Sequence, residues 1–221
     1  MKRQIIRLIK LILGLFLFAV GIVMTLNANL GVAPWDVFHQ GLSRVTGITI
    51  GQANIVVGLL IIILDAVLGQ DIGWGTILNM ILIGTFIDIL MLNNLIPTFN
   101  NFFPSLIMLV LGIVVEGYGC WIYLLAQLGA GPRDGLMVIL TKRTGKSVRF
   151  NKSMAELGAV IVGYFLGGSL GLGTVIMAFL GGPIFQWVFK TVNFNVKDVE
   201  HRFIQDDIKY LKEKFKIKKE N

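Results

Sequence analysis

The sequence is poor in the residues that most soluble enzymes use for chemistry. Its 221 residues include one cysteine, two histidines and 13 acidic side chains. A single cysteine, Cys120, excludes both a disulfide framework and a cysteine-based metal site. No spacing typical of a nucleophile–base pair, a phosphate-binding loop or a metal site is present. We therefore expect no enzyme activity, no cofactor and no bound metal.

Charged residues are also scarce, and apolar ones are abundant. Charged side chains make up 15% of the chain, whereas soluble domains usually carry about 25%. Hydrophobic residues reach 55%, and the mean hydropathy is +0.75. A spanning helix needs roughly 20 apolar residues. Six apolar runs approach this length, three of them by extending into glycine-rich flanks: Leu11–Asn29, Ile55–Leu68, Thr76–Leu92, Leu106–Leu125, Ala155–Leu166 and Val175–Phe189.

The net charge of +7 is placed in a way that predicts membrane topology. Basic residues cluster just outside the apolar runs and in the C-terminal tail, as the positive-inside rule describes. This distribution argues against a nucleic-acid partner and for membrane lipids. The basic segment Met1–Lys10 followed by an apolar run resembles a signal peptide. We interpret it as a retained first helix, because the run can span a bilayer and its counterpart recurs inside the chain.

An internal repeat is the strongest pattern in the chain. The segment LGVAPWD at 30–36 returns as LGAGPRD at 128–134, an offset of 98 residues. Glycine and threonine positions match at the same offset without a gap, for example Gly14 with Gly112 and Gly84 with Gly182. A repeated unit of this kind decides the architecture of a chain. The pattern predicts that each unit consists of a long helix, the LGxxPxD break, a short helix and two further long helices.

The break has local causes. Proline lacks an N–H group and disfavours helix in the preceding residue. Asp36 and Asp134 suit the N-cap of the following short helix, and Gly47 and Gly145 suit its C-terminal stop. The short helices Trp35–Val45 and Arg133–Arg143 cannot cross a bilayer. They are either interfacial helices or re-entrant half-helices.

Basic residues test the orientation of the two units. The loop at 30–50 carries only Arg44, whereas its copy at 128–152 carries six basic residues, and the link at 93–104 carries no charge. These counts place both termini in the cytoplasm and give the two units opposite orientations.

The predicted fold class is therefore an all-α transmembrane protein with six spanning helices in two inverted three-helix repeats. The first repeat covers residues 1–92 and an external linker covers 93–104. The second repeat covers 105–190, and a basic cytoplasmic tail covers 191–221. Apolar residues at near-helical spacing in that tail (Val199, Phe203, Ile208, Leu211 and Phe215) predict an amphipathic helix.

Three segments together resemble a known family. They are LGVAPWDVFHQGLSRVTGITIGQ, IGWGTILNMILIGTFID and QLGAGPRDGLMVILTKRTGKSVRF, followed by Glu156-Leu157-Gly158. The chain resembles the YczE/YyaS/YitT family of bacterial membrane proteins, most of all its YczE branch, from about Gly14 to Phe189. The resemblance implies this fold and a bacterial plasma membrane. It implies no activity, and the soluble C-terminal domain of YitT-type members is absent.

The short helices are candidate parts of a solute site. Interrupted helices in inverted repeats frame the sites of many secondary transporters. This analogy selects Pro34, Asp36, Pro132 and Asp134; the alternative is that these residues only break and cap interfacial helices. Arg133 replaces Trp35 in the second motif. Arg133 either binds an anionic solute or is one more basic residue that keeps this loop on the cytoplasmic side of the membrane.

Ionisable side chains inside apolar runs are further candidates, because their burial in lipid is costly. Glu116 lies near the middle of the fourth run, where its repeat counterpart is Phe18, and Glu156 lies in the fifth run. Asp65, Asn79 and Asp88 are additional polar candidates. Structural hydrogen bonding is the alternative role for each.

These patterns favour a permease-like secondary transporter of a small solute. A non-transporting scaffold that recruits a cytoplasmic partner, and the substrate-binding membrane subunit of an uptake complex, are the alternatives. GxxxG spacings such as Gly163 to Gly167 fit packing within one bundle or a homodimer.

Overall fold

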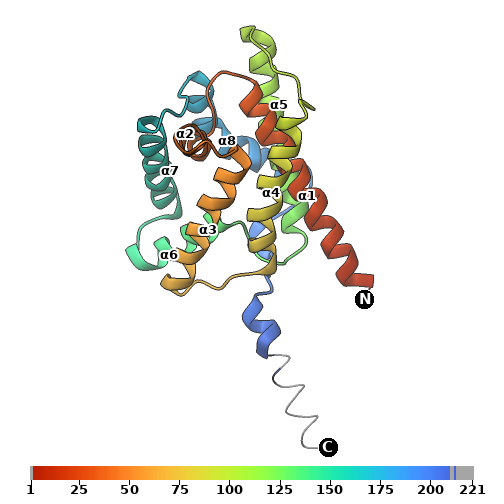
Figure 1. Cartoon of the computed structure of the whole chain (residues 1–221). Coiled ribbons are helices and arrows are strands. Elements are labelled where there is room, and N and C mark those ends of the chain that lie inside the picture. The colour runs from red at the N-terminus through yellow and green to blue at the C-terminus, as the bar shows by residue number, and fades with distance from the viewer. Residues whose placement is uncertain (1, 210–211, 213–221) are drawn as a thin grey trace, which may run out of the picture.

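The computed structural model describes residues 2–209 and 212, and within them it contains only helices and connecting loops (Figure 1). Both described ends of the chain lie at one end of the bundle. The labelled helices are α1 (Lys2–Asn27), α2 (Pro34–Thr46), α3 (Ile50–Leu68), α4 (Trp74–Leu92), α5 (Phe102–Leu124), α6 (Pro132–Thr144), α7 (Val148–Phe165), α8 (Leu172–Thr191) and η1 (Val196–Asp198), and residues 204–209 are also helical.

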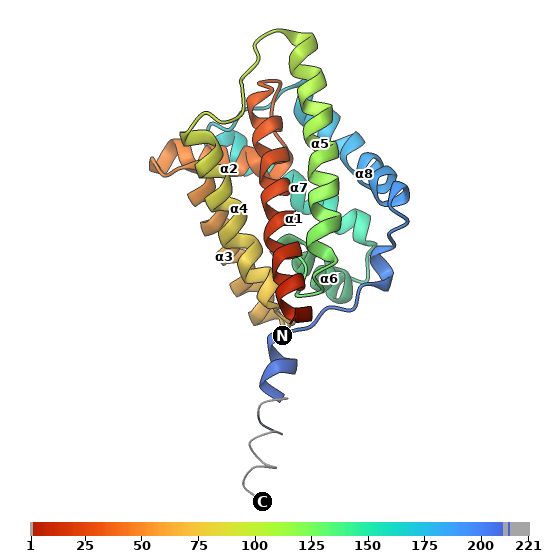
Figure 2. The ribbon, with the colours of Figure 1, turned by 90° about the vertical axis from the view of Figure 1, so that its right-hand side faces the viewer.

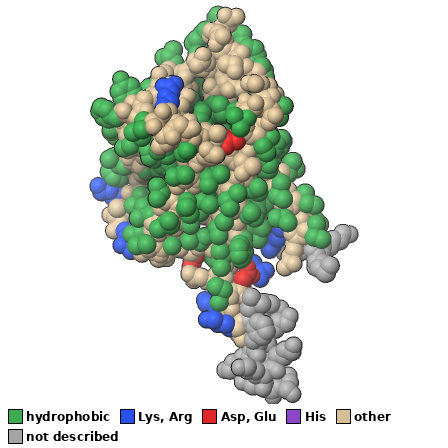
Figure 3. All heavy atoms as spheres, in the orientation of Figure 1, with side chains coloured by type: hydrophobic (Ala, Val, Ile, Leu, Met, Phe, Trp, Pro, Cys, Tyr) green, Lys and Arg blue, Asp and Glu red, His purple; other side chains and the backbone are tan. Residues whose placement is uncertain are grey.

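Five of these helices are long and apolar enough to cross a membrane: α1, α3, α4, α5 and α8. The multi-pass, all-helical character expected from the sequence is therefore confirmed for the described residues. The fifth predicted span lies in α7, which is not among the five. Its 18 residues include Arg149, Lys152 and Glu156, whereas α3, α4, α5 and α8 carry one charged residue each. The visible face is covered mainly by apolar side chains, with only a few charged ones among them (Figure 3).

Helices α1 and α5 form the central pair of the bundle and run antiparallel. They lie side by side over most of their length (Figure 2). A Cβ atom built on Gly14 would lie 2.4 Å from the backbone nitrogen of Tyr123, and one built on Gly119 would lie 2.5 Å from that of Phe18. Only glycine permits this approach. Small residues serve the same purpose in membranes, where helices associate by van der Waals packing.

The two LGxxPxD loops are joined to the bundle in the same way. The amide of Gly75, in the first turn of α4, donates to the carbonyl of Leu128 at 2.6 Å. In the other half, the amide of Gly173 in α8 donates to Leu30 at 2.7 Å. Each motif loop therefore caps the start of a long helix that belongs to the other half of the chain.

Backbone features recur at the 98-residue offset seen in the sequence. Helices start at Pro34 and Pro132, at Ile50 and Val148, and at Trp74 and Leu172. Left-handed residues follow the same offset, including Gly47 (φ 76°) and Gly145 (φ 65°), which end α2 and α6 as expected. The bounds of both short helices were predicted to within a residue.

The predicted N-caps are wrong. The N-cap residues are Ala33 and Gly131, and Asp36 and Asp134 lie in the first turn of their helices. The reason is the proline, whose fixed φ and missing N–H suit the first helical position. The two aspartates instead place negative charge near the positive end of the helix dipole.

The tail also differs from expectation. Only residues 204–209 and 212 are helical between η1 and the end of the described chain, so Val199 and Phe203 precede the helix. Leu211 and Phe215 lie outside the described residues. The tail is attached by its backbone instead, through Arg202 N–H to Gln127 O at 2.9 Å and Ile204 N–H to Ile72 O at 3.0 Å.

The two halves differ in one packing contact. Helix α3 packs along α4, whereas α7 does not pack along the equivalent α8. A Cβ on Gly84 would lie 2.5 Å from the carbonyl oxygen of Gly51, while a Cβ on its counterpart Gly182 meets nothing within 4 Å. The second half is therefore more open than the first.

This difference predicts opposite outcomes for a matched pair of variants. We expect Gly84→Ala to destabilise the protein by about 1–3 kcal/mol, because the new methyl group separates α3 from α4. Gly182→Ala, at the equivalent position, should leave stability unchanged or raise it slightly, since alanine favours helix. Thermal unfolding of both variants in one detergent tests this. Equal effects would contradict the described packing of α7 and α8.

Candidate solute site

Side chains at the N-terminal ends of α2 and α6 meet inside the bundle. The guanidinium carbon of Arg133 lies 5.1 Å from the centre of the Trp35 ring, a cation–π distance. Trp35 and Arg133 occupy the same place in the two motifs, 98 residues apart. The short helices thus approach each other at equivalent positions, although α2 lies toward one end of the bundle and α6 toward the other.

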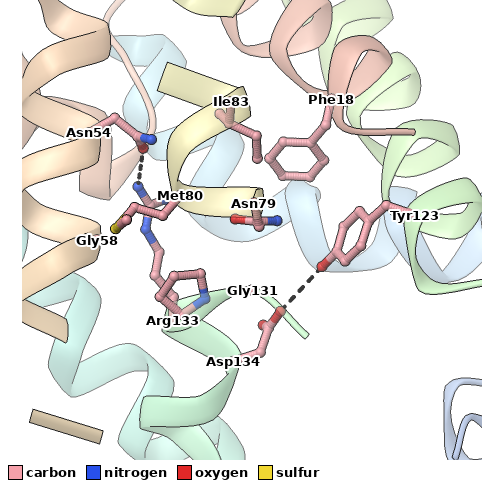
Figure 4. A pocket seen from close by; sticks show the side chains of 11 residues that line it. Phe18, Asn54, Gly58, Asn79, Met80, Ile83, Tyr123, Gly131, Arg133 and Asp134 are labelled. Atoms are coloured by element: carbon pink, nitrogen blue, oxygen red, sulfur yellow. Dashed lines mark hydrogen bonds between the residues drawn. The ribbon is translucent and has the colours of Figure 1, made fainter. Parts of the chain in front are cut away.

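Arg133 is held by side chains from the first half of the chain. Its Nη2 donates to Asn54 Oδ1 on α3 at 3.2 Å (Figure 4). The same nitrogen lies 3.1 Å from His39 Nε2 on α2. Both partners are acceptors without a formal negative charge. The guanidinium is therefore positioned without its charge being neutralised by direct contact.

His39 connects Arg133 to Asp36. The imidazole is fully buried, and its Nδ1 lies 3.0 Å from Asp36 Oδ1, whose side chain is 5% exposed. With Nδ1–H donated to the carboxylate, Nε2 is left as an acceptor for Arg133, so the geometry selects one tautomer. Asp36 thus fixes the orientation of the ring that orients the arginine.

A cavity of about 120 Å³ lies beside this network. Helix α6 supplies its charged wall, α3 and α4 supply the amides of Asn54 and Asn79, and α1 and α4 supply an apolar wall. The lining residues are Phe18, Asn54, Gly58, Asn79, Met80, Ile83, Tyr123, Gly131, Pro132, Arg133 and Asp134.

Two charges of opposite sign border the cavity at successive positions. In Figure 4, Arg133 extends toward Asn54, and Asp134 extends away from it toward Tyr123. The Tyr123 hydroxyl donates to Asp134 Oδ2 over 3.4 Å, at the long end of hydrogen-bond distances. Asp134 is exposed, so the cavity reaches the surface beside it.

Of the residues selected from the sequence, Pro132, Arg133, Asp134 and Asn79 line the cavity. Asp36 joins them through His39, and Pro34 is buried as the first residue of α2.

Glu116 is not among the lining residues. Its side chain packs at the α1–α5 contact, where a Cβ on Gly21 would lie 2.5 Å from its Cγ.

The remaining candidates lie apart from the cavity. Asp88 accepts from the Thr49 hydroxyl at 2.5 Å and the Gly51 amide at 2.9 Å, so it holds the start of α3. Glu156 lies 3.8 Å from Lys152 on the same helix. Asp65 is 2% exposed and faces Gly135 of α6, and its Oδ1 has no hydrogen-bond partner in the described part of the chain.

The tail passes close to the exposed edge of the cavity. His201 lies near enough to Asp134 for their charges to interact, and partial burial lowers the pKa of its imidazole, an effect that the Asp134 charge opposes. The Trp74 indole donates to Asp207 at 3.2 Å, which adds a side-chain attachment. The described tail therefore lies against the face at which α6 begins.

Sequence reasoning missed His39, Asn54 and Tyr123 as parts of the site. Asn54 lies within an apolar segment and could have been noted as a buried amide. Nothing in the sequence pairs Asn54 with a residue 79 positions away. Within the described residues, no group of three His, Cys, Asp or Glu side chains could hold a metal ion.

Comparison with known proteins places the chain in a family. The model of a family of unknown function (DUF6198) matches residues 5–190. The chain belongs to the DUF6198 family. Relatives include "Uncharacterized membrane protein YczE" of Bacillus subtilis (strain 168), which is 38% identical over 79% of this chain and 81% of its own length. An "Uncharacterized protein" of Haemophilus influenzae is 33% identical, over 82% of this chain and 83% of its own.

The resemblance stated from the sequence motifs is thereby confirmed. "Uncharacterized protein YyaS" of B. subtilis is also similar to this DUF6198 chain, at 27% identity over 78% of it and 87% of the relative. No solved structure matches the chain. The membrane character of this chain agrees with the name of the YczE relative, which calls it a membrane protein.

The polar network of this DUF6198 protein predicts energetic coupling between His39 and Arg133. We expect a double-mutant cycle with His39→Ala and Arg133→Ala to give a coupling of about 0.5–3 kcal/mol, because each residue loses the same contact. Chemical or thermal unfolding in detergent measures it. His39→Ala combined with Arg143→Ala should instead be additive within about 0.5 kcal/mol. Additivity of the first pair would contradict the hydrogen bond.

Proposed function

We propose that this protein is a permease-like secondary transporter of a small solute in the bacterial plasma membrane. The observation that carries the proposal is the meeting of two short-helix N-termini, at Trp35 and Arg133, beside a polar cavity. Interrupted helices that direct their N-termini at a central site are a recurring plan of secondary transporters. The dipoles of these helix ends favour a solute that carries negative charge.

Inverted repeats are part of the proposal. Support comes from α1 and α5, which start equivalent units and run antiparallel in contact, and from the reciprocal docking of the motif loops. An antiparallel pair of equivalent helices is the relation expected of two units inserted in opposite orientations. Exchange of the two units' conformations would then open the cavity to alternate sides.

We take α7 as the sixth crossing. Its charged residues Arg149 and Lys152 lie in its first turns, where long basic side chains reach the membrane surface. An even number of crossings agrees with the two described ends of the chain lying at one end of the bundle. By the positive-inside rule this end, which also carries α6 and its basic residues, faces the cytoplasm.

Alternating access can be tested without knowing the solute. In a Cys120→Ala background, we expect Asn79→Cys to react with a membrane-impermeant thiol reagent in both right-side-out and inverted vesicles, because its side chain lines the cavity. Ile81→Cys, two residues along α4 on an exposed apolar position, should react from neither side. Mass spectrometry or gel shift of the labelled protein measures the extent.

Labelling of Asn79→Cys from one side only would overturn the transport proposal. The cavity would then be a fixed vestibule, and the scaffold that recruits a cytoplasmic partner would become the leading function. Comparable labelling of Ile81→Cys would instead show that the reagent reaches lipid-facing thiols.

A further inference from the structure

We propose that the cavity binds a small zwitterion, a solute with a carboxylate and an ammonium group a few atoms apart. The inference rests on the proposed function, since it names the class of solute for the same site. It follows from the way Arg133 and Asp134 are held on either side of one cavity.

The guanidinium of Arg133 has N–H groups that the described hydrogen bonds do not use and that can bind a carboxylate. A guanidinium carries five N–H groups. Both described hydrogen-bond partners, His39 and Asn54, are at Nη2. The ion pairs within 4.0 Å in the described part of the chain do not include Arg133. Three N–H groups at Nε and Nη1 therefore remain for a ligand, and guanidinium binds carboxylates with two parallel hydrogen bonds.

A simple anion is a poor match for these surroundings. Four carboxylates act electrostatically on Arg133, namely those of Asp36, Asp134, Glu116 and Glu156. Those of the four that are ionised would repel a ligand that brings only negative charge. A simple cation is disfavoured in turn by Arg133 in the cavity wall. A ligand with both charges meets neither difficulty.

Asp134 is the matching partner for an ammonium group. Its hydrogen bond from Tyr123 is 3.4 Å long, and an ionised carboxylate can accept several donors. The side chain is directed away from Arg133, so the two charges lie apart on the cavity wall. A ligand that spans them satisfies both at once.

The rest of the lining limits the ligand's size and shape. Phe18, Met80 and Ile83 form the apolar part of the lining, with Phe18 and Ile83 across the cavity from the charges, which suits a short aliphatic group. The amide of Asn79 lies between the charged residues and the apolar wall. A volume of about 120 Å³ favours solutes of few heavy atoms over bulky ones.

Three probes of similar size separate the possibilities: alanine, propionate and ethylamine. We expect millimolar alanine to raise the unfolding temperature of the purified full-length protein. Propionate and ethylamine should bind about tenfold or more weakly, because each lacks one charge-assisted contact. Arg133→Gln and Asp134→Asn should each weaken alanine binding by about tenfold or more, whereas Arg143→Gln, on the same helix but outside the lining, should not.

Arg133→Lys is a second variant, for use if Arg133→Gln does not fold. Lysine keeps the positive charge but cannot donate the two parallel hydrogen bonds of a guanidinium. It should fold and still bind alanine weakly. Equal stabilisation by propionate and alanine, or none by any probe, would overturn the zwitterion inference. The thiol labelling of Asn79→Cys needs no ligand, so two-sided labelling with failed alanine binding would overturn this inference and leave the transport proposal standing.

Discussion

The close approach of α1 and α5 is the contact on which the rest of the structure depends. Glycines at equivalent places, Gly14 with Gly112 and Gly21 with Gly119, bring the two backbones together where any side chain would clash. Because the pair is antiparallel, each helix ends beside the start of the other half, and its motif loop reaches across to cap a helix there. The cavity lies against this pair, with Phe18 of α1 and Tyr123 of α5 in its wall. The contact between Trp35 of α2 and Arg133 of α6 therefore depends on the packing of α1 against α5.

Much of this fold is readable from glycine and proline positions. Gly47 and Gly145 end helices because they adopt the left-handed conformation, and Pro34 and Pro132 start them because proline suits the first position. The N-cap expectation failed because proline, rather than aspartate, fixes where the helix begins. The difference between α3–α4 and α7–α8 does have a signal in the sequence, because Gly51 of α3, which approaches Gly84, is replaced by Arg149 at the equivalent place in α7.

The candidate site was predictable in part. The motif itself selected Arg133 and Asp134, because a charge at a helix break within an apolar sequence needs a partner or a solute. Glu116 was a candidate because it lies near the middle of an apolar run, but hydropathy gives depth along a helix and not the direction of a side chain, which here packs against Gly21 of α1. His39 looked like an ordinary polar residue of α2, and only the fold brings its ring between Asp36 and Arg133. Contacts between residues 79 and 94 positions apart have no local signal.

The contact between Trp35 and Arg133 has a consequence for how such a chain can arise. Two identical three-helix subunits that paired about a two-fold axis would bring each residue at this position against its own copy. Arginine would then face arginine, with two like charges in contact, or tryptophan would face tryptophan, with no cation to hold. Joining the units in one polypeptide removes that restriction, because each copy of the gene segment can mutate separately. A ring and a cation can share the meeting point only in a protein whose halves are no longer encoded by the same codons.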